Sequence, residues 1–357
     1  MERKRDLNLD LIRSVAVVLV LFLHFIVGSG WYAMPNVGFA HWAMNFLRAL
    51  FIDCVPLFLL LSGYLCCRKE LSARYYLGLV GIYAIYLLAC AASLLGRRFV
   101  LGEELDLREI LGGILNHHAN SYSWYVAMYT GLFLMIPFLN LAFRGLGTRR
   151  RQLALVWTMI YLSAAPTLLN MRVHLYEVWW DRLYPLAYYF IGAYLREHRR
   201  ALRPGPLALG LLAALVGSAT LNHLVSSPGV FGWMDYSWYH GFETMGTSVL
   251  LFLLLLNLDL RGCPAPLARA IGGLSRLSFG VYLFSDLTDM AIYRLARQWI
   301  PAGSAWMWAY ALCAVASLLA SIPLAWLAEK LAAPAIRGVS RGLSALVRRL
   351  VPGDTRS

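Results

Sequence analysis

Long apolar runs, separated by short polar stretches, dominate the pattern of positions along the chain. The runs are close to the roughly 20 residues that an α-helix needs to cross a bilayer, and they are longer than barrel strands. We therefore predict an all-α, polytopic integral membrane helix bundle. About ten spans are expected, near residues 9–28, 43–67, 74–96, 122–143, 153–170, 183–196, 206–223, 244–260, 271–293 and 306–328.

The polar stretches differ in charge, and this difference predicts the orientation of the chain. RKELSAR, RGLGTRRR, REHRRALRPG and RGCPAPLAR are basic, and they alternate with stretches that are not. With the N-terminus inside, 23 Lys and Arg fall on the inner side and 8 on the outer side. Because Lys and Arg accumulate in cytoplasmic loops, both termini are predicted to be cytoplasmic.

The composition agrees with a membrane protein rather than a nucleic-acid-binding one. The chain is 60% hydrophobic and 14% charged, whereas a soluble domain is about a quarter charged. The basic inner loops account for the net charge of +13, so the expected partner is the lipid bilayer and no nucleic acid is expected. The cysteines lack the spacing of a zinc site or a disulfide framework, and we expect structural thiols at Cys54, Cys66, Cys67, Cys90, Cys263 and Cys313.

No polar segment is long enough to fold separately, so residues 1–330 are predicted to form one membrane domain. Residues 331–357 form a basic amphipathic tail, which is expected to lie on the inner leaflet. The start of the chain has features of a signal peptide, but Glu2, Asp6 and His24 favour an uncleaved first span. No internal repeat is visible, which argues against a transporter built from inverted repeats.

The first span carries ionisable residues where lipid-compatible ones are expected. Arg13 and His24 are eleven residues apart, so they share one helix face about 16 Å apart along the axis. Asp10 lies three residues before Arg13 and can reach it on the same face.

Arg13 taken alone could extend to the inner headgroups, and His24 could be a core histidine bonded to another helix. Ionisable residues within a membrane usually face a bundle interior or a water-filled cavity, and the shared face favours a functional pair. An arginine near the cytoplasm suits a phosphorylated donor, and a histidine suits proton transfer.

Five stretches, in chain order, resemble motifs of the type-3 membrane acyltransferases. LDLIRSVAVVLVLFLH (9–24) resembles the first helix of that family, and VPLFLLLSGYL (55–65) resembles its second helix. WYVAMYTGLFLMIPFL (124–139), YFIGAYL (189–195) and SFGVYLFSDL (278–287) resemble later segments. The matches extend over most of the chain.

This resemblance implies acyl transfer, usually of an acetyl group, from a cytoplasmic acyl-CoA to a hydroxyl of a cell-surface or exported polysaccharide or glycolipid. It implies a multi-pass protein of the bacterial plasma membrane, in which acyl-CoA is a substrate and no cofactor or metal is bound. Arg13 and His24 would be the functional pair, with Asp10, Ser62 and Tyr125 in support.

Two positions depart from the family pattern. Relatives often have His before Leu-Trp-Tyr, where this chain has Tyr122, and they have His in a later YLxHPL motif, where it has Ser285 followed by Asp286. No role of a second histidine therefore carries over to this chain.

The second motif also has a packing interpretation. Pro56 frees a backbone carbonyl, and the small Ser62 and Gly63 permit another helix to approach closely. Ser62 as an acyl-bearing nucleophile is the alternative, although SGY is not a nucleophile elbow.

Tryptophan and histidine are unevenly distributed between the two sides. Ten of the twelve tryptophans fall on the predicted outer side, and only Trp157 and Trp326 fall on the inner side. Outer stretches also hold His41, His117, His118, His174, His223 and His240. Interface anchoring normally marks both sides, so we expect the outer rings to contribute to an acceptor surface.

Acceptor contacts are predicted at Trp124, Trp233, Trp238 and His240, mostly within VFGWMDYSWYHGFE (230–243). Anchoring at the membrane interface is the rival explanation. Glu243 could orient His240, or it could be a carboxylate at the start of a helix. A metal at His117 and His118 is not expected, because adjacent residues lack a paired ligand motif.

These residues suggest a mechanism. Arg13 would bind the phosphates of the donor, and His24 would accept the proton of the attacking hydroxyl. The alternative class is a non-catalytic membrane protein of the same fold that binds or exports glycans.

Overall fold

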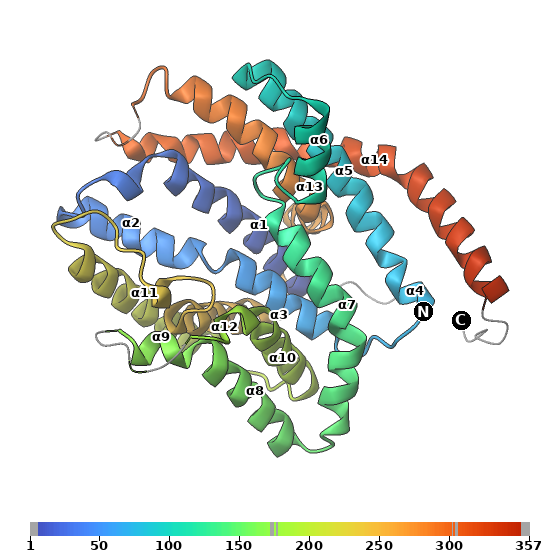
Figure 1. The fold of residues 1–357 in the computed structure, drawn as a ribbon. Helices are drawn as coiled ribbons and strands as arrows, with labels where there is room; N and C mark the ends of the chain where they lie inside the picture. Colours follow the sequence, from blue (N-terminus) through green and yellow to red (C-terminus); the bar gives the residue numbers. More distant parts are fainter. Residues whose placement is uncertain (1–5, 172–174, 176–177, 302, 304–305, 351–357) are drawn as a thin grey trace. The chain divides into compact units, whose positions relative to one another are not determined.

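The computed structural model describes residues 6–171, 175, 178–301, 303 and 306–350 (Figure 1). Some residues used in the predictions lie outside the described part of the chain. They are the basic residues 3–5, His174 and residues 351–357 of the predicted tail.

The secondary structure of the described residues is helical throughout, with no strand. Helices are expected in lipid, because they satisfy backbone N–H and C=O groups within one segment. The α-helices are α1 (Leu7–Gly28), α2 (Gly38–Phe51), α3 (Cys54–Cys66), α4 (Ala73–Tyr76), α5 (Gly78–Gly96), α6 (Leu107–Leu115), α7 (Trp124–Gly145), α8 (Arg149–Ser163), α9 (Ala165–Leu169), α10 (Tyr184–Glu197), α11 (Pro204–Ser226), α12 (Phe242–Asn257), α13 (Ala265–Ala296) and α14 (Tyr310–Leu350).

The predicted all-α class is confirmed, and each of the ten predicted spans is helical. Seven helical stretches in the described part of the chain are long and apolar enough to cross a membrane. They are Leu7–Gly28, Gly38–Cys66, Ala73–Leu101, Trp124–Gly145, Pro204–Ser226, Asp235–Asn257 and Met307–Leu343.

The other three predicted spans stay predictions, as does the side of each terminus. They correspond to α8 with α9, to α10 and to α13. The first two are short, because α8 has 15 residues and α10 has 14. α13 has 32 residues and carries charges along its length, among them Arg276, Asp286 and Asp289.

The second predicted span is divided into α2 and α3. The break lies at Ile52 and Asp53, a few residues before Pro56. Proline has no N–H to donate to the carbonyl four residues earlier, which here belongs to Ile52. The Cys54 thiol lies 3.9 Å from that carbonyl oxygen. A proline on the C-terminal side of the break thus explains the change of helix.

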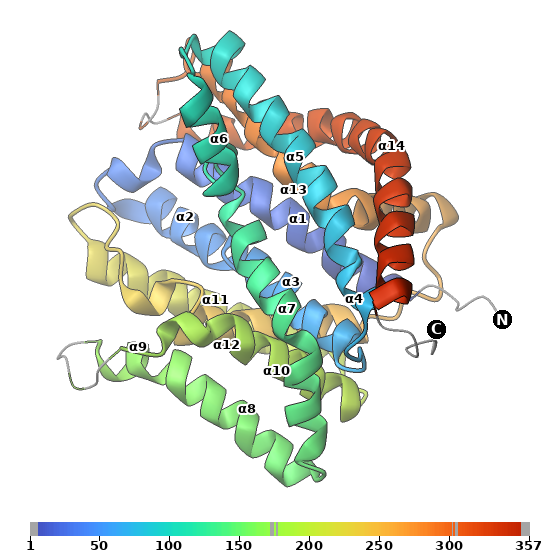
Figure 2. The same cartoon turned by 45° about the vertical axis from the view of Figure 1, so that its right-hand side comes forward.

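The chain divides into two compact units. The first contains Met1–Cys67, Ala142–Ser278 and Ala296–Val315, and the second contains Arg68–Leu141, Phe279–Leu295 and Ala316–Ser357. In the first unit α1 packs against α2, α3 and α12, and α11 packs against α2 and α12 (Figure 2).

Within the first unit, α3 and α10 cross through facing glycines. A Cβ atom on Gly63 would lie 2.0 Å from the carbonyl oxygen of Tyr189, and one on Gly192 would lie 2.1 Å from that of Leu60. The backbones of the two helices are therefore in direct contact. The close approach predicted for the Ser62–Gly63 pair is confirmed, and it joins two of the five motif stretches, 55–65 and 189–195.

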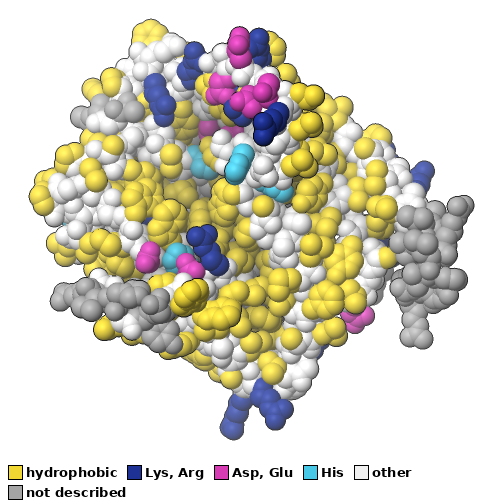
Figure 3. All heavy atoms as spheres, viewed as in Figure 1, with side chains coloured by type: hydrophobic (Ala, Val, Ile, Leu, Met, Phe, Trp, Pro, Cys, Tyr) yellow, Lys and Arg dark blue, Asp and Glu magenta, His cyan; other side chains and the backbone are white. Residues whose placement is uncertain are grey.

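Part of the first unit has the surface expected of a helix that faces lipid. On the face drawn in Figure 3, hydrophobic side chains extend along α8, and Lys and Arg gather at the lower end, where α8 begins. Trp157 of α8 is 61% exposed and Tyr161 is 45% exposed.

In the second unit, aromatic contacts hold the start of the 73–101 stretch against α7. The Tyr75 ring stacks on Phe133 at 4.4 Å between centroids, and its hydroxyl donates to the Phe133 carbonyl. Residues 331–350, the described part of the predicted tail, continue α14 without a break.

Candidate functional site

Three residues of the first unit form a hydrogen-bonded group at the predicted inner end of α1. Ser275 of α13 donates from Oγ to Asp10 Oδ1 at 2.7 Å, and Arg13 Nη1 donates to the same Ser275 Oγ at 3.1 Å. Asp10 is buried, with 5% of its surface exposed. A serine that is 262 residues away in the sequence thus connects the two residues predicted to interact.

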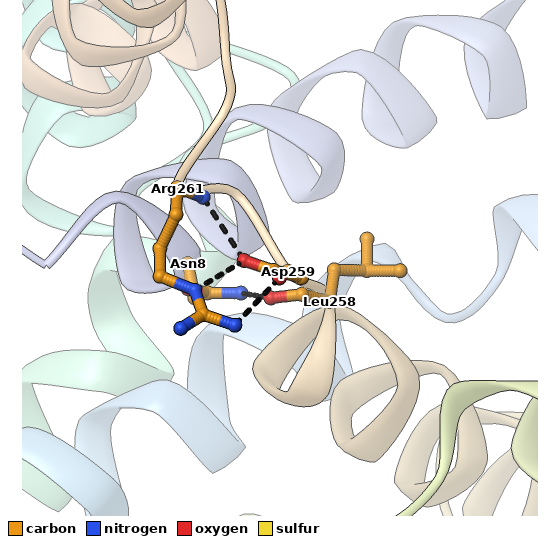
Figure 4. A network of polar contacts seen from close by, with 4 residues as sticks. All are labelled: Asn8, Leu258, Asp259 and Arg261. Atoms are coloured by element: carbon orange, nitrogen blue, oxygen red, sulfur yellow. Dashed lines mark hydrogen bonds and ion pairs between the residues drawn. The ribbon is translucent and has the colours of Figure 1, made fainter.

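The C-terminal end of α12 lies close by in the same unit. Asn8 donates from Nδ2 to the carbonyl of Leu255 at 2.8 Å. The same Nδ2 donates to the carbonyl of Leu258 at 2.9 Å (Figure 4). Arg199 donates to the carbonyl of Leu256 and to the hydroxyl of Tyr64. The last carbonyls of a helix have no partner within it, and a cation there is favourable.

Figure 4 also shows an exposed ion pair directly after α12. Arg261 Nη2 lies 2.8 Å from Asp259 Oδ2. Hydrogen bonds from Arg261 lower the pKa of the Asp259 carboxyl to about 2. Asp259 therefore stays ionised at neutral pH and does not fit the role of a general acid.

His24 lies on the same unbroken helix as Arg13. A separation of eleven residues in a continuous α-helix places the two side chains within roughly 20° of each other around the axis. Both side chains are partly exposed. The structure thus provides the shared face that the sequence predicted, and the chemical roles of the two residues stay predictions.

The other two predicted supporting residues, Ser62 and Tyr125, belong to different units. Ser62 of α3 donates its hydroxyl to the carbonyl of Phe58 one turn earlier, a bond that serine often makes in apolar helices. Tyr125 belongs to the second unit, where it is buried and contacts the rings of Tyr129 and Tyr282. Trp124 is its ring neighbour at 6.2 Å.

Two of the predicted acceptor residues, Trp233 and Trp238, lie together. Their rings stack 5.1 Å apart, and Tyr32 stacks on Trp233 at 4.5 Å. The guanidinium of Arg48 lies 4.6 Å from the ring centre of Phe231. Trp233 is 49% exposed and Trp238 is 37% exposed, so this cluster presents aromatic surface to its surroundings.

Polar side chains lie next to these rings in the first unit. Arg48 of α2 donates from Nη1 to the Ser237 carbonyl at 3.0 Å. Ser218 and Asn222 of α11 both donate to Glu243 Oε2, at 2.9 and 3.0 Å. Glu243 thus bonds to α11. The predicted acceptor residue His240 lies nearby in sequence, with its ring 6.5 Å from that of Tyr184.

A chain of hydrogen bonds extends along α2 from the same cluster. The Trp31 indole donates to His41 Nδ1, and Asn45 donates to Asn36 Oδ1 at 3.0 Å. His223 Nδ1 lies 3.0 Å from that same oxygen. The sequence analysis did not select these asparagines, although Asn45 and Arg48 are one turn apart in an apolar helix.

Asp53 is a further residue that the sequence analysis missed. Its side chain is fully buried, and Thr247 and Ser248 of α12 both donate to Oδ1 at 2.7 Å. A carboxyl group at a break within a membrane-spanning stretch is costly to keep, which is a signal of function that the sequence contained.

The two positions that depart from the family pattern belong to a polar network in the second unit. The Tyr122 hydroxyl donates to Asp289 Oδ2 at 2.7 Å, and Ser317 donates to Asp289 Oδ1 at 2.5 Å. Ser285 donates to the Tyr282 carbonyl in its own helix. Asp286 is also buried, with 3% of its surface exposed.

The described residues contain neither a metal-ligand group nor a disulfide. No group of three or more His, Cys, Asp or Glu suited to a metal occurs in the described part of the chain. The six cysteines, all of them described, are free thiols.

Comparison with protein families gives a match over nearly the whole chain. The family model described as an acyltransferase domain matches residues 6–326. The matched region includes Arg13, His24 and Ser275. Neither a curated protein nor a solved structure matches the chain significantly.

Proposed function

Since the chain belongs to the acyltransferase 3 family and is a membrane acyltransferase, we propose that it transfers an acetyl group from acetyl-CoA to a saccharide hydroxyl. The acceptor would be a cell-surface or exported polysaccharide or a glycolipid, and the enzyme would work in the plasma membrane of a bacterium. Acetyl-CoA is the donor substrate.

The observation that carries the proposal is the group formed by Asp10, Ser275 and Arg13. Asp10 and Arg13 lie on the helix that also bears His24, and Ser275 lies on α13. Ser275 and Asp10 fix the guanidinium at the predicted cytoplasmic end of α1. A fixed, planar guanidinium makes two-pronged contacts to phosphate oxygens. Arg13 would therefore hold the phosphates of CoA, with the thioester extending toward His24.

The chemical step follows from the position of His24 on the same face. His24 takes the proton of the acceptor hydroxyl as the oxygen attacks the thioester carbonyl. A C–O bond forms, the C–S bond breaks, and the proton passes from His24 to the departing thiolate. The products are the acetylated saccharide and CoA with a free thiol.

A second candidate is a non-catalytic membrane protein that binds or exports glycans. The polar network of the second unit favours it, because Tyr122 and Ser285 stand where relatives often have histidine, and both hydroxyls donate hydrogen bonds within the protein. The two candidate functions differ in whether the protein transfers an acetyl group.

The test supplies membranes containing the full chain with acetyl-CoA carrying a labelled acetyl group. We expect labelled acetyl in envelope glycans, detected by mass spectrometry, and its loss in cells that lack the protein. Glycans with equal acetylation in both strains, together with no release of free CoA, would favour the non-catalytic candidate.

A further inference from the structure

Six polar residues of the first unit form what we call the outer seam. They come from α2, α11, the start of α12 and the stretches next to them, and they are Asn36, Asn45, Arg48, Asn222, Tyr236 and Glu243. Hydrogen bonds join Asn45 to Asn36 and Asn222 to Glu243, both at 3.0 Å. His223, next to Asn222, reaches Asn36 at 3.0 Å and connects the two groups.

The outer seam is buried although it is polar. The five residues other than Glu243 are at most 4% exposed. Seven buried side-chain atoms of the seam have no hydrogen-bond partner: Arg48 Nε and Nη2, Asn36 Nδ2, Asn45 Oδ1, Asn222 Oδ1, Glu243 Oε1 and the Tyr236 hydroxyl. Native proteins pair such atoms almost always with protein groups, ordered water or a ligand, so a concentration of them in one place indicates polar partners that the protein itself does not supply.

The types of these atoms specify the ligand. Three are donors, three are acceptors, and the Tyr236 hydroxyl can act as either. The seam contains one basic residue, Arg48, and one acidic residue, Glu243, which interact electrostatically, so neither sign of charge predominates among its residues. A neutral molecule whose groups both donate and accept fits this set, and sugar hydroxyls have that property.

The aromatic rings next to the seam also suit a sugar. Arg48 lies against Phe231 and Trp233, and Trp238 stacks on Trp233. Flat aromatic faces pack on the C–H faces of sugar rings, while the polar seam receives the hydroxyls. Trp233 and Trp238 are partly exposed, so the ligand would enter from the side of the 230–243 stretch.

We propose that the outer seam binds one neutral saccharide unit, with Arg48, Asn222 and Glu243 as the residues that select it. The inference rests on the proposed function in one respect, that this saccharide is the acyl acceptor. The alternative is a polar core that only stabilises the fold.

Binding can be measured without catalysis, on the full chain in lipid nanodiscs. Saturation-transfer NMR would be recorded with N-acetylglucosamine (neutral), glucuronic acid (anionic) and glucosamine (cationic). We expect stronger saturation transfer to N-acetylglucosamine than to either charged sugar. Asn222→Leu and Arg48→Met should each lower the affinity for N-acetylglucosamine about tenfold. Thr220→Val is the matched control, because Thr220 lies exposed on α11 and bonds to Trp42.

Glu243→Gln keeps the shape of the side chain and keeps the protein foldable even if Arg48→Met does not. It leaves the Arg48 charge unbalanced, so the preference should shift toward glucuronic acid. Two results would overturn the proposal and assign the seam to stability alone. One is a folded Glu243→Gln protein whose preference among the three sugars is unchanged. The other is a wild-type protein that shows no saturation transfer to any of them.

Kinetics tests the link to catalysis separately. The seam variants should raise the apparent KM for the saccharide about tenfold, whereas the control Thr220→Val should leave it unchanged. A wild type that binds the neutral sugar but never transfers acetyl would refute the proposed function and leave the binding site standing. Transfer with an unchanged KM in Asn222→Leu would remove the seam from the acceptor site.

Discussion

At the scale of single residues, Arg13 is placed by contacts rather than by its position in the sequence alone. Its Nη1 donates to Ser275, which in turn donates to the buried Asp10. An arginine that only extended to the headgroups would not need this arrangement. The guanidinium is therefore already oriented, which would lower the entropic cost of binding the phosphates of the proposed donor.

Arg13→Lys should raise the KM for acetyl-CoA about tenfold, because an ammonium group lacks the planar, two-pronged geometry. The acceptor KM should not change. Initial rates against donor concentration provide the measurement, and Arg261→Lys, in the exposed pair with Asp259, is the matched control. Equal donor KM values in the two variants would argue against phosphate binding by Arg13.

Ser275→Ala should weaken donor binding less than Arg13→Lys does, about threefold, because the guanidinium remains but loses its positioning partner. Ser275→Thr restores the hydroxyl and should recover most of the affinity. If Ser275→Ala and Ser275→Thr have the same donor affinity, Ser275 has a packing role and no positioning role.

The residue-level predictions succeeded where partners are close in sequence. Asp10 and Arg13, three residues apart, do lie in one group, as helix spacing indicates. Ser275 could not be predicted, because its helix begins more than 250 residues later. Most of the outer seam was missed for the same reason, since its residues come from three helices and the stretches next to them. The sequence analysis named only Glu243 and the stretch 230–243 that contains Tyr236, although polar residues one turn apart in apolar helices were a usable signal.

At the scale of elements, α3 and α10 cross in direct backbone contact, and two of the sequence motifs explain this contact. The stretches SGYL and YFIGAYL contribute one glycine each, and each glycine faces the backbone of the other helix. Two of the five motif stretches are thus accounted for by packing, and their presence alone is not evidence of a catalytic role for Ser62.

Gly63→Ala should destabilise the protein by about 3 kcal/mol, because a methyl group has no room against the backbone of α10. Gly246→Ala is the matched control. Nothing lies within 4 Å of the new methyl group, and alanine is favoured over glycine in a helix by about 1 kcal/mol. Thermal unfolding in detergent measures both, and a Tm for Gly63→Ala that equals that of the wild type would contradict the contact.

Helix positions were predictable from apolar runs, and Pro56 indicated a disturbed helix, but the exact positions of the helix breaks were not predictable. The break at Ile52 and Asp53 separates α2 from α3 within one predicted span, and a second change separates α8 from α9 near Ala164. Both depend on backbone hydrogen bonds near a proline, Pro56 or Pro166, and hydropathy does not report those bonds.

At the scale of the whole molecule, the charge distribution makes a prediction that fold and family leave open. The bias of 23 to 8 in Lys and Arg predicts that both termini are cytoplasmic. Seven helical stretches of the described chain can cross a membrane, and the shorter or more polar helices α8, α10 and α13 complete the predicted ten.

Reporter fusions test this topology. A cytoplasmic reporter fused after residue 357 should be active, and one fused after residue 232 should be inactive, because the latter joint is predicted to lie outside. A periplasmic reporter should give the reverse pattern. Signals from one and the same side at both positions would refute the ten-span arrangement, and with it the placement of the 230–243 stretch near an external acceptor.

The central claim is that His24 performs the proton transfer, and acetyl transfer by His24→Ala tests it most directly. The measurement is the transfer of labelled acetyl from acetyl-CoA to glycan, at matched amounts of folded protein in membranes. His198→Ala serves as the control, because His198 lies near the predicted inner surface and is bonded to Gln152. The account predicts a loss of at least about a hundredfold for His24→Ala, with donor binding retained and His198→Ala unaffected; near-normal transfer by His24→Ala would contradict it and move the chemistry to another residue.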